Sequence, residues 1–200
     1  EENYAGYFKR SNTTGRSANE KASELRNSVT STSGRERWSS VSGDDEYARW
    51  NITITGATSA DDYRNAANTY GFNVEIDPFA PSSTPKKRTA MGRFAHEGAW
   101  VAPVTVGKPV VFYMGCDSSF EYIYKFVSTA VWDAADINGG LAAGDKYLDA
   151  GKLYAAKFNS NFTGEWLELT TGLTGSQGMP AHISPSETYT FSDMSVDPYL

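Results

Sequence analysis

Large apolar and polar residues alternate through the middle of the chain. A period of two indicates β-strands, because successive side chains of a strand point to opposite faces. In 121–126 this alternation puts Tyr122, Tyr124 and Phe126 on one face, and it leaves Glu121 free to point away from the core. Strands are predicted at 72–76, 88–94, 99–106, 109–114, 121–127, 153–159 and 165–169. Short strands joined by polar turns are typical of an antiparallel meander, as in a propeller blade or a sandwich sheet.

A first helical pattern follows Ser17. Ser17 and Glu20 have the spacing of a capping box, in which each residue satisfies a free backbone N–H at the start of a helix. Leu25 and Val29 continue an apolar period close to that of a helix. The pattern predicts a short surface helix with these two residues on its apolar side.

A second helical pattern begins at Ser59. Its hydroxyl can cap a helix together with Asp62, and Gly71 can terminate that helix. One face of the predicted helix carries Ala60, Tyr63, Ala67 and Tyr70. The sequence therefore predicts a helix from Ser59 to Tyr70.

Composition along the chain predicts three regions. Residues 1–70 are polar and loop-rich with short helices, 71–170 form the β-sheet core with the candidate site, and 171–200 are a loop-rich tail that continues into a larger fold. Residues 132–150 are rich in Gly, Ala and Asp, which predicts a long loop between strands. The expected fold is mainly β, made of antiparallel meander sheets with one or two short helices and long loops.

Charge and hydropathy argue against binding to nucleic acid and against a membrane-spanning helix. The 200 residues carry a formal net charge of −6, and no long basic run occurs, so nucleic acid is not an expected partner. No apolar stretch approaches the roughly 20 residues of a membrane-spanning helix, and none is predicted. Cys116 is the single cysteine, so no disulfide within the chain is expected.

Several common catalytic motifs are absent from the sequence. His96 and Glu97 lack the second histidine of a zinc-hydrolase helix, since Trp100 holds its position. The sequence contains neither the nucleophile elbow of a serine hydrolase nor a phosphate-binding Gly-x-x-x-x-Gly-Lys loop. An EF-hand calcium loop at 133–139 fails at Ala134, so a solvated turn is the simpler interpretation.

A group of acidic residues remains as the candidate metal site. Its members are Glu97, Asp117 and Glu121 with Cys116, joined by Glu1 and Glu2 near the start of the chain. Carboxylates on a tight turn between rigid strands suit a metal ion. The competing interpretation is turn chemistry for Asp117, an ion pair of Glu121 with a lysine or arginine such as Lys125, and a small buried side chain for Cys116.

Specific strings within these strands resemble the PhoX-type alkaline phosphatases. The resemblance covers about residues 70–170, and the strings that carry it occur in the family's order. They are Phe72-Asn-Val-Glu-Ile-Asp-Pro-Phe79, Lys87-Arg-Thr-Ala-Met-Gly-Arg-Phe-Ala-His-Glu-Gly-Ala99, Val111-Phe-Tyr-Met-Gly115, Phe120-Glu-Tyr-Ile-Tyr-Lys-Phe-Val127 and Leu153-Tyr-Ala-Ala-Lys-Phe-Asn159. The opening Glu1-Glu2-Asn3-Tyr4 also resembles the family segment that follows a cysteine.

The resemblance implies a longer, β-propeller-like enzyme that hydrolyses phosphate monoesters with calcium and iron. It also implies export, hence a periplasmic or extracellular location. Glu97 matches a metal-binding glutamate of the family's His-Glu-Gly string and is the expected catalytic residue. Cys116 and Asp117 match the two acidic residues of its Gly-Asp-Asp string, but Cys116 stands where the family usually has aspartate. Calcium has little affinity for sulfur, so calcium should be weakened there or shifted to Asp117.

Further family parts are expected outside the 200 residues. An iron-binding cysteine would precede Glu1 and an Arg-Pro-Glu string would follow Leu200, so another chain or segment would complete the site. Arg93 is a candidate phosphate ligand, with a structural salt bridge as the alternative. His96 is expected to support the metal ligands from behind or to pack in a strand, rather than to act as a base. The expected function is metal-dependent phosphomonoester hydrolysis by a partial chain. The alternative is a non-catalytic β-propeller fragment that serves as a structural or assembly module.

Overall fold

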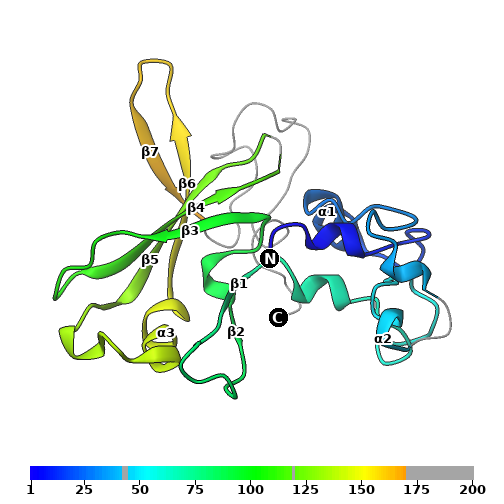
Figure 1. The fold of residues 1–200 in the computed structure, drawn as a ribbon. Coiled ribbons are helices and arrows are strands. Elements are labelled where there is room, and N and C mark those ends of the chain that lie inside the picture. The colour runs from blue at the N-terminus through cyan, green and yellow to red at the C-terminus, as the bar shows by residue number, and fades with distance from the viewer. Residues whose placement is uncertain (42–44, 119, 170–200) are drawn as a thin grey trace.

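The structure, a computed structural model, describes residues 1–41, 45–118 and 120–169. It is mainly antiparallel β with a few short helices, which confirms the predicted fold class. Figure 1 shows a sheet on one side, short helices and long connections on the other, and the N-terminus between them. The predicted tail at 171–200 lies outside the described residues.

The large sheet has five strands in the order of the sequence. They are β3 (His96–Val101), β4 (Pro109–Cys116), β5 (Ile123–Val131), β6 (Gly151–Phe158) and β7 (Gly164–Glu168). Every neighbouring pair is antiparallel. The predicted meander is therefore confirmed, with strand ends shifted by a few residues and β3 beginning three residues before its predicted start.

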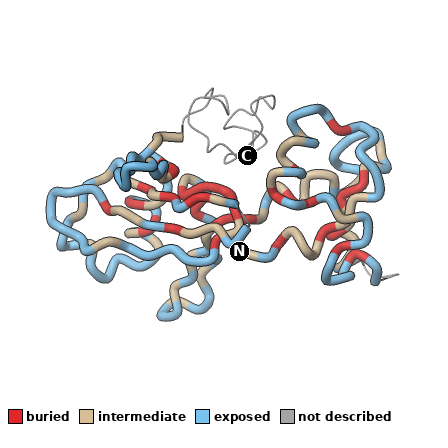
Figure 2. Tube along the Cα trace, turned by 90° about the horizontal axis from the view of Figure 1, so that it is seen from above, coloured by how far each residue is buried: buried red, intermediate tan, exposed pale blue. Residues whose placement is uncertain are grey.

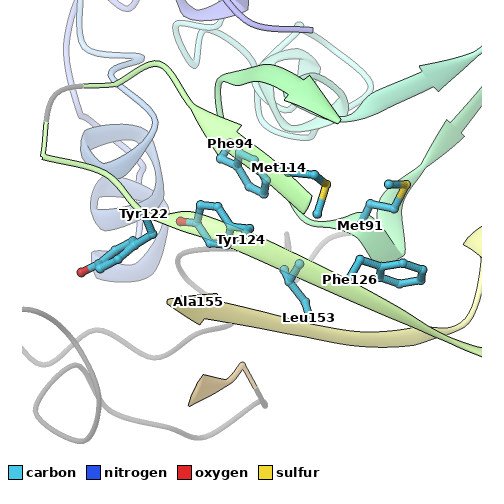
Figure 3. Packing of buried hydrophobic residues seen from close by; sticks show 8 residues of the cluster. All are labelled: Met91, Phe94, Met114, Tyr122, Tyr124, Phe126, Leu153 and Ala155. Atoms are coloured by element: carbon cyan, nitrogen blue, oxygen red, sulfur yellow. The ribbon is translucent and has the colours of Figure 1, made fainter. Parts of the chain in front are cut away.

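One face of this sheet holds the larger core, shown in Figure 3. Tyr122, Tyr124 and Phe126 are all buried, as the alternation predicts, and the ring of Phe94 stacks on Tyr124 at 4.0 Å between centroids. Burial of each such side chain stabilises the fold by roughly 1.5–3 kcal/mol. The cluster is completed by Met91, Met114, Leu153 and Ala155.

A small two-stranded sheet precedes the large one. It pairs β1 (Asn73–Glu75) with β2 (Lys86–Arg88), which confirms the strand predicted at 72–76. The strand predicted at 88–94 is wrong, since the 3₁₀ helix η4 (Thr89–Met91) follows β2 directly. Gly92 then takes φ +94°, and a Cβ there would lie 2.7 Å from Leu153. The chain turns sharply at Gly92 because only glycine combines this φ with so close an approach.

The prediction of a long loop at 132–150 is wrong. This segment contains the 3₁₀ helix η5 (Ala134–Asp136) and the helix α3 (Gly140–Leu148). Tyr147 is buried, its ring packs 5.2 Å from that of Trp132, and its hydroxyl donates to Asp136. Tertiary packing of this one aromatic residue stabilises a helix that its Gly-rich sequence does not suggest.

The first predicted helix is confirmed as α1 (Ala18–Arg26), and Ser17 and Glu20 form the expected capping box. Its predicted apolar side is wrong at Leu25, which is 59% exposed. Glu24 is buried in its place, because Arg10 and Arg16 pair with it at 2.9 and 3.0 Å.

The second predicted helix is wrong. Of 59–70, only the 3₁₀ helix η3 (Ala66–Thr69) is helical. Asp62 accepts hydrogen bonds from the backbone N–H groups of Thr55 and Gly56 at 2.8 and 3.0 Å. It also pairs with Arg64 at 2.7 Å. Local side-chain hydrogen bonds of this kind compete with helix formation.

A second core lies in the N-terminal part, where Figure 2 shows buried stretches separate from those of the sheet. It consists of Tyr4, Phe8, Val29, Trp50, Ile52 and Ala67. The other short elements around it are η1 (Tyr4–Tyr7), η2 (Trp38–Ser40) and α2 (Asp45–Ala48). Within the described ranges, no helix has the length and apolarity needed to cross a membrane.

Candidate metal centre

Glu97 lies at an irregularity near the start of β3. The register with β4 shifts between His96 and Gly98, so Glu97 is the extra residue of a β-bulge. A bulge redirects a side chain away from the alternating pattern. The neighbouring His96 is buried, with its ring stacked on Phe94 at 3.7 Å, whereas Glu97 is exposed. The bulge therefore presents the Glu97 carboxylate to solvent at the edge of the sheet.

Asp117 follows the last residue of β4 and lies beside the bulge. Cys116 pairs with His96 in the sheet, and the backbone N–H of Asp117 donates to Ala95 at 2.9 Å. This hydrogen bond closes the ends of β3 and β4 against each other. Two acidic residues that are twenty positions apart in the sequence thus become neighbours.

Glu2 comes from the N-terminal segment, which Glu1 ties to the sheet side. One carboxylate oxygen of Glu1 accepts from the N–H groups of Gly71 and Phe72, and the other pairs with Lys87 at 2.8 Å. Glu2 itself accepts a hydrogen bond from Asn3 at 2.6 Å. The contacts of Glu1 thereby hold the adjacent Glu2 close to the bulge.

Ligand oxygens of Glu2, Glu97 and Asp117 all lie within 4.8 Å of one another. It is the one group of three or more potential metal-ligating side chains among the residues that the structure describes. Partial burial raises the pKa of Glu2, and the neighbouring Asp117 and Glu97 raise it further. Carboxylates that converge in this way favour either a shared proton or a cation.

A cavity of about 190 Å³ opens beside this group. Glu2 and Asp117 line one part of it, and Arg26 and Arg35 line another. Its remaining walls come from the start of the chain, the end of α1 and the turn after β4. A space with carboxylates and guanidinium groups on its walls can hold a cation and an anion together.

Three predicted ligands lie outside this group of carboxylates: Glu1, whose contacts are given above, Cys116 and Glu121. Cys116 packs against the core of the sheet, and burial raises the pKa of its thiol. Glu121 pairs with Arg26 at 2.5 Å and accepts a hydrogen bond from the hydroxyl of Tyr124 at 2.9 Å. Glu121 therefore pairs with an arginine, in line with the competing interpretation, although the partner is Arg26 of α1 rather than Lys125.

Arg93 lies apart from the cavity and is buried. Its guanidinium donates to the backbone carbonyls of Tyr70 and Ala67, at 2.8 Å each, and to the hydroxyl of Ser23 at 3.4 Å. These bonds connect the sheet side with the N-terminal part. The guanidinium of Arg93 therefore donates its hydrogen bonds to groups of the protein itself. Its partners are carbonyls and a hydroxyl, and not the carboxylate of a salt bridge.

His96 packs in the sheet, as the sequence predicts. Burial lowers the pKa of His96 to about 4, although its hydrogen bond to the carbonyl of Gly92, at 3.0 Å, favours the charged form. The ring is therefore neutral at pH 7, and it stacks on Phe94.

The basic wall of the cavity is the part that sequence reasoning missed. Arg26 and Arg35 belong to the polar stretch 11–37, which has no aromatic residue and lies outside the strings that carry the resemblance described above. The one available signal is the number of arginines in this stretch, and that signal does not say which of them meet the carboxylates.

Comparisons with known proteins identify relatives of the chain. The family model described as alkaline phosphatase PhoX matches residues 1–195. Among solved structures, Pseudomonas fluorescens PhoX in complex with vanadate, a transition state analogue, is similar, with 36% identity and a TM-score of 0.66. The match covers 86% of this chain and 27% of that chain, so the chain spans about a quarter of that structure's length. No curated protein matches the chain.

Proposed function

Because the chain belongs to the PhoX alkaline phosphatase family, we propose that it carries part of a metal-dependent site that hydrolyses phosphate monoesters. The observation that carries this proposal is the meeting of Glu2, Glu97 and Asp117 within 4.8 Å. These residues come from separate parts of a chain that the family model matches almost throughout. The vanadate complex of the similar Pseudomonas protein supports a phosphate-like ligand.

Calcium fits the residues that meet here. All three side chains offer carboxylate oxygens, and calcium takes oxygen ligands in flexible geometries. Iron would benefit from a thiolate, but burial keeps the thiol of Cys116 protonated and the residue packs against the core. We therefore assign Glu2, Glu97 and Asp117 to calcium, and we expect any iron to depend on ligands other than the residues that the structure describes.

The protein groups have distinct roles in this proposal. When bound, the cation supplies positive charge against the oxygens of the phosphate group. Glu97 sits on a bulge of the sheet, so its carboxylate is held by a rigid element. The backbone of Asp117 is fixed by its bond to Ala95, which orients its side chain beside Glu97. Glu2 supplies the third carboxylate, and burial and the neighbouring carboxylates raise its pKa, so a cation would stabilise its charged form.

Calcium titration of the purified chain tests the assignment of ligands. We expect Glu97→Gln and Asp117→Asn to weaken calcium binding at least about tenfold, because each removes an anionic ligand. Glu165→Gln, which alters an exposed glutamate paired with Lys157 on the far edge of the sheet, should bind calcium as the wild type does.

Hydrolysis of p-nitrophenyl phosphate with and without chelator tests the reaction, alongside elemental analysis for calcium and iron. Turnover that a chelator abolishes would support the proposal. Metal-free protein without turnover, even after calcium is supplied, would favour a non-catalytic β-propeller fragment. Since the chain spans 27% of the similar structure, the assay should be repeated with the family's remaining segments added. A periplasmic or extracellular location is part of the same proposal.

A further inference from the structure

The two arginines that line the cavity differ in what holds them. The guanidinium of Arg26 is buried between Glu121, at 2.5 Å, and the hydroxyl of Tyr124, at 3.1 Å. The side chain of Arg35 is 64% exposed and has one carboxylate partner, Glu36, at 2.5 Å. Arg26 therefore belongs to the framework of the cavity, whereas Arg35 can reach a ligand in it.

Arg35 is positioned over the cavity by the N-terminal segment. Its Nη2 donates to the side chain of Asn3 at 3.3 Å, beside Glu2 in the sequence. The guanidinium lies flat against Gly6, since a Cβ at that position would come within 3.1 Å of Nε and Nη2. The backbone N–H of Glu36 also donates to the carbonyl of Gly6 at 2.9 Å. These contacts fix Arg35 to the same segment that brings Glu2 to the metal centre.

The guanidinium keeps donors for a ligand. An arginine has five N–H groups in a planar fork. Among the residues that the structure describes, Glu36 engages the Nε donor and Asn3 engages one Nη2 donor. The remaining donors, including both on Nη1, match the geometry with which arginine binds two phosphate oxygens.

We propose that Arg35 is a substrate-binding residue, which holds the phosphate group of a monoester in the cavity that it lines together with Glu2 and Asp117. This inference rests on the proposed function, because the carboxylates of the candidate metal centre would otherwise repel the anion. With a divalent cation at the carboxylates, a phosphate dianion meets the positive charge of both the cation and the guanidinium. A phosphate diester has one negative charge less and one free oxygen less, so the arrangement favours monoesters and inorganic phosphate.

Titration of inorganic phosphate into the calcium-loaded chain, followed by calorimetry, tests the role of Arg35. Arg35→Gln should weaken phosphate binding at least about tenfold, because a charged hydrogen-bond pair is lost, while calcium affinity stays as in the wild type. Arg35→Lys should bind more weakly than wild type but more tightly than Arg35→Gln, because lysine keeps the charge and loses the fork. The matched control is Arg37→Gln, two residues further on and exposed.

The outcomes separate this inference from the proposed function. Equal phosphate affinity of Arg35→Gln and Arg37→Gln would overturn the role of Arg35 and leave the metal centre intact. A calcium-loaded wild type that does not bind phosphate would overturn both the role of Arg35 and the phosphate substrate. A loss confined to Arg35→Gln, with calcium affinity unchanged, would establish Arg35 as the phosphate ligand.

Discussion

The sheet and the N-terminal part bury their cores by different means. In the sheet, hydrogen bonds between neighbouring strands satisfy the backbone, and alternating side chains fill one face. In the N-terminal part, many backbone groups are instead satisfied by hydrogen bonds to side chains. Arg16 donates to the backbone carbonyls of Ile52 and Arg64 at 2.8 Å each, and Asp62 accepts from two backbone N–H groups. A region with little regular structure can fold when buried charged side chains take over the role of strand pairing.

Of the substitutions considered, removal of Arg16 should destabilise the N-terminal part most, while the sheet keeps its stability. Arg16→Met leaves Glu24 with one fewer cation and leaves two carbonyls unpaired, which should cost about 4 kcal/mol in the N-terminal part. Hydrogen exchange should show lost protection within residues 1–70 and retained protection in the sheet. Lys21→Met, at an exposed position of α1, is the control. Simultaneous loss of protection in both parts would show that they unfold as one unit.

Acid should destabilise the sheet, because His96 is buried there in its neutral form. Burial lowers the pKa of His96 to about 4, below its value near 6.5 in an unfolded chain. The unfolded state therefore binds a proton first as the pH falls. The stability that neutral His96 contributes is complete above about pH 6.5 and lost on the way to pH 4, up to about 3 kcal/mol.

Urea denaturation between pH 4 and 7 measures this effect. The His96→Gln variant should show a shallower fall in unfolding free energy over this range than the wild type does, because it lacks the titrating ring. Parallel curves for the two proteins would contradict the assignment of a buried, neutral His96.

Arg88 is a buried arginine on the sheet side of the molecule and can be compared with Arg16 of the N-terminal part. Its guanidinium pairs with Glu75, Asp145 and Asp149 at 2.5–2.9 Å and joins β2 to α3. Arg88→Met should cost about 2 kcal/mol, less than Arg16→Met, because its partners remain partly exposed to water. Thermal unfolding measures the change. Lys86→Met, which breaks an exposed pair with Asp145, should change stability little.

The smallest expected effect is at the cap of α1. Ser17→Ala removes the side chain that accepts the N–H of Glu20, which should cost about 1 kcal/mol. The exposed Ser82, changed to Ala, is the control. Urea unfolding of both variants measures the change in unfolding free energy. A loss at Ser17 well above about 1 kcal/mol would mean that α1 supports the whole N-terminal part.

The candidate metal centre could be predicted in part from the sequence. Glu97 and Asp117 follow from the resemblance to PhoX phosphatases, and the structure brings them together. Of the other members that the sequence suggested, the structure brings only Glu2 next to them, whereas Glu121 binds Arg26. No local pattern encodes these partners, because they depend on how segments far apart in the chain are packed.

The sequence by itself determined strands β4 and β5 and the cap of α1. The apolar run 109–114, the alternation in 121–127 and the pair Ser17 and Glu20 act through neighbours a few residues away, so local spacing is sufficient. Only the tertiary structure decided that Glu24 is buried and Leu25 exposed, because two arginines from other segments compensate the buried charge. The bulge at Glu97 and the place of Arg35 over the cavity are likewise tertiary, since both arise where separate segments meet.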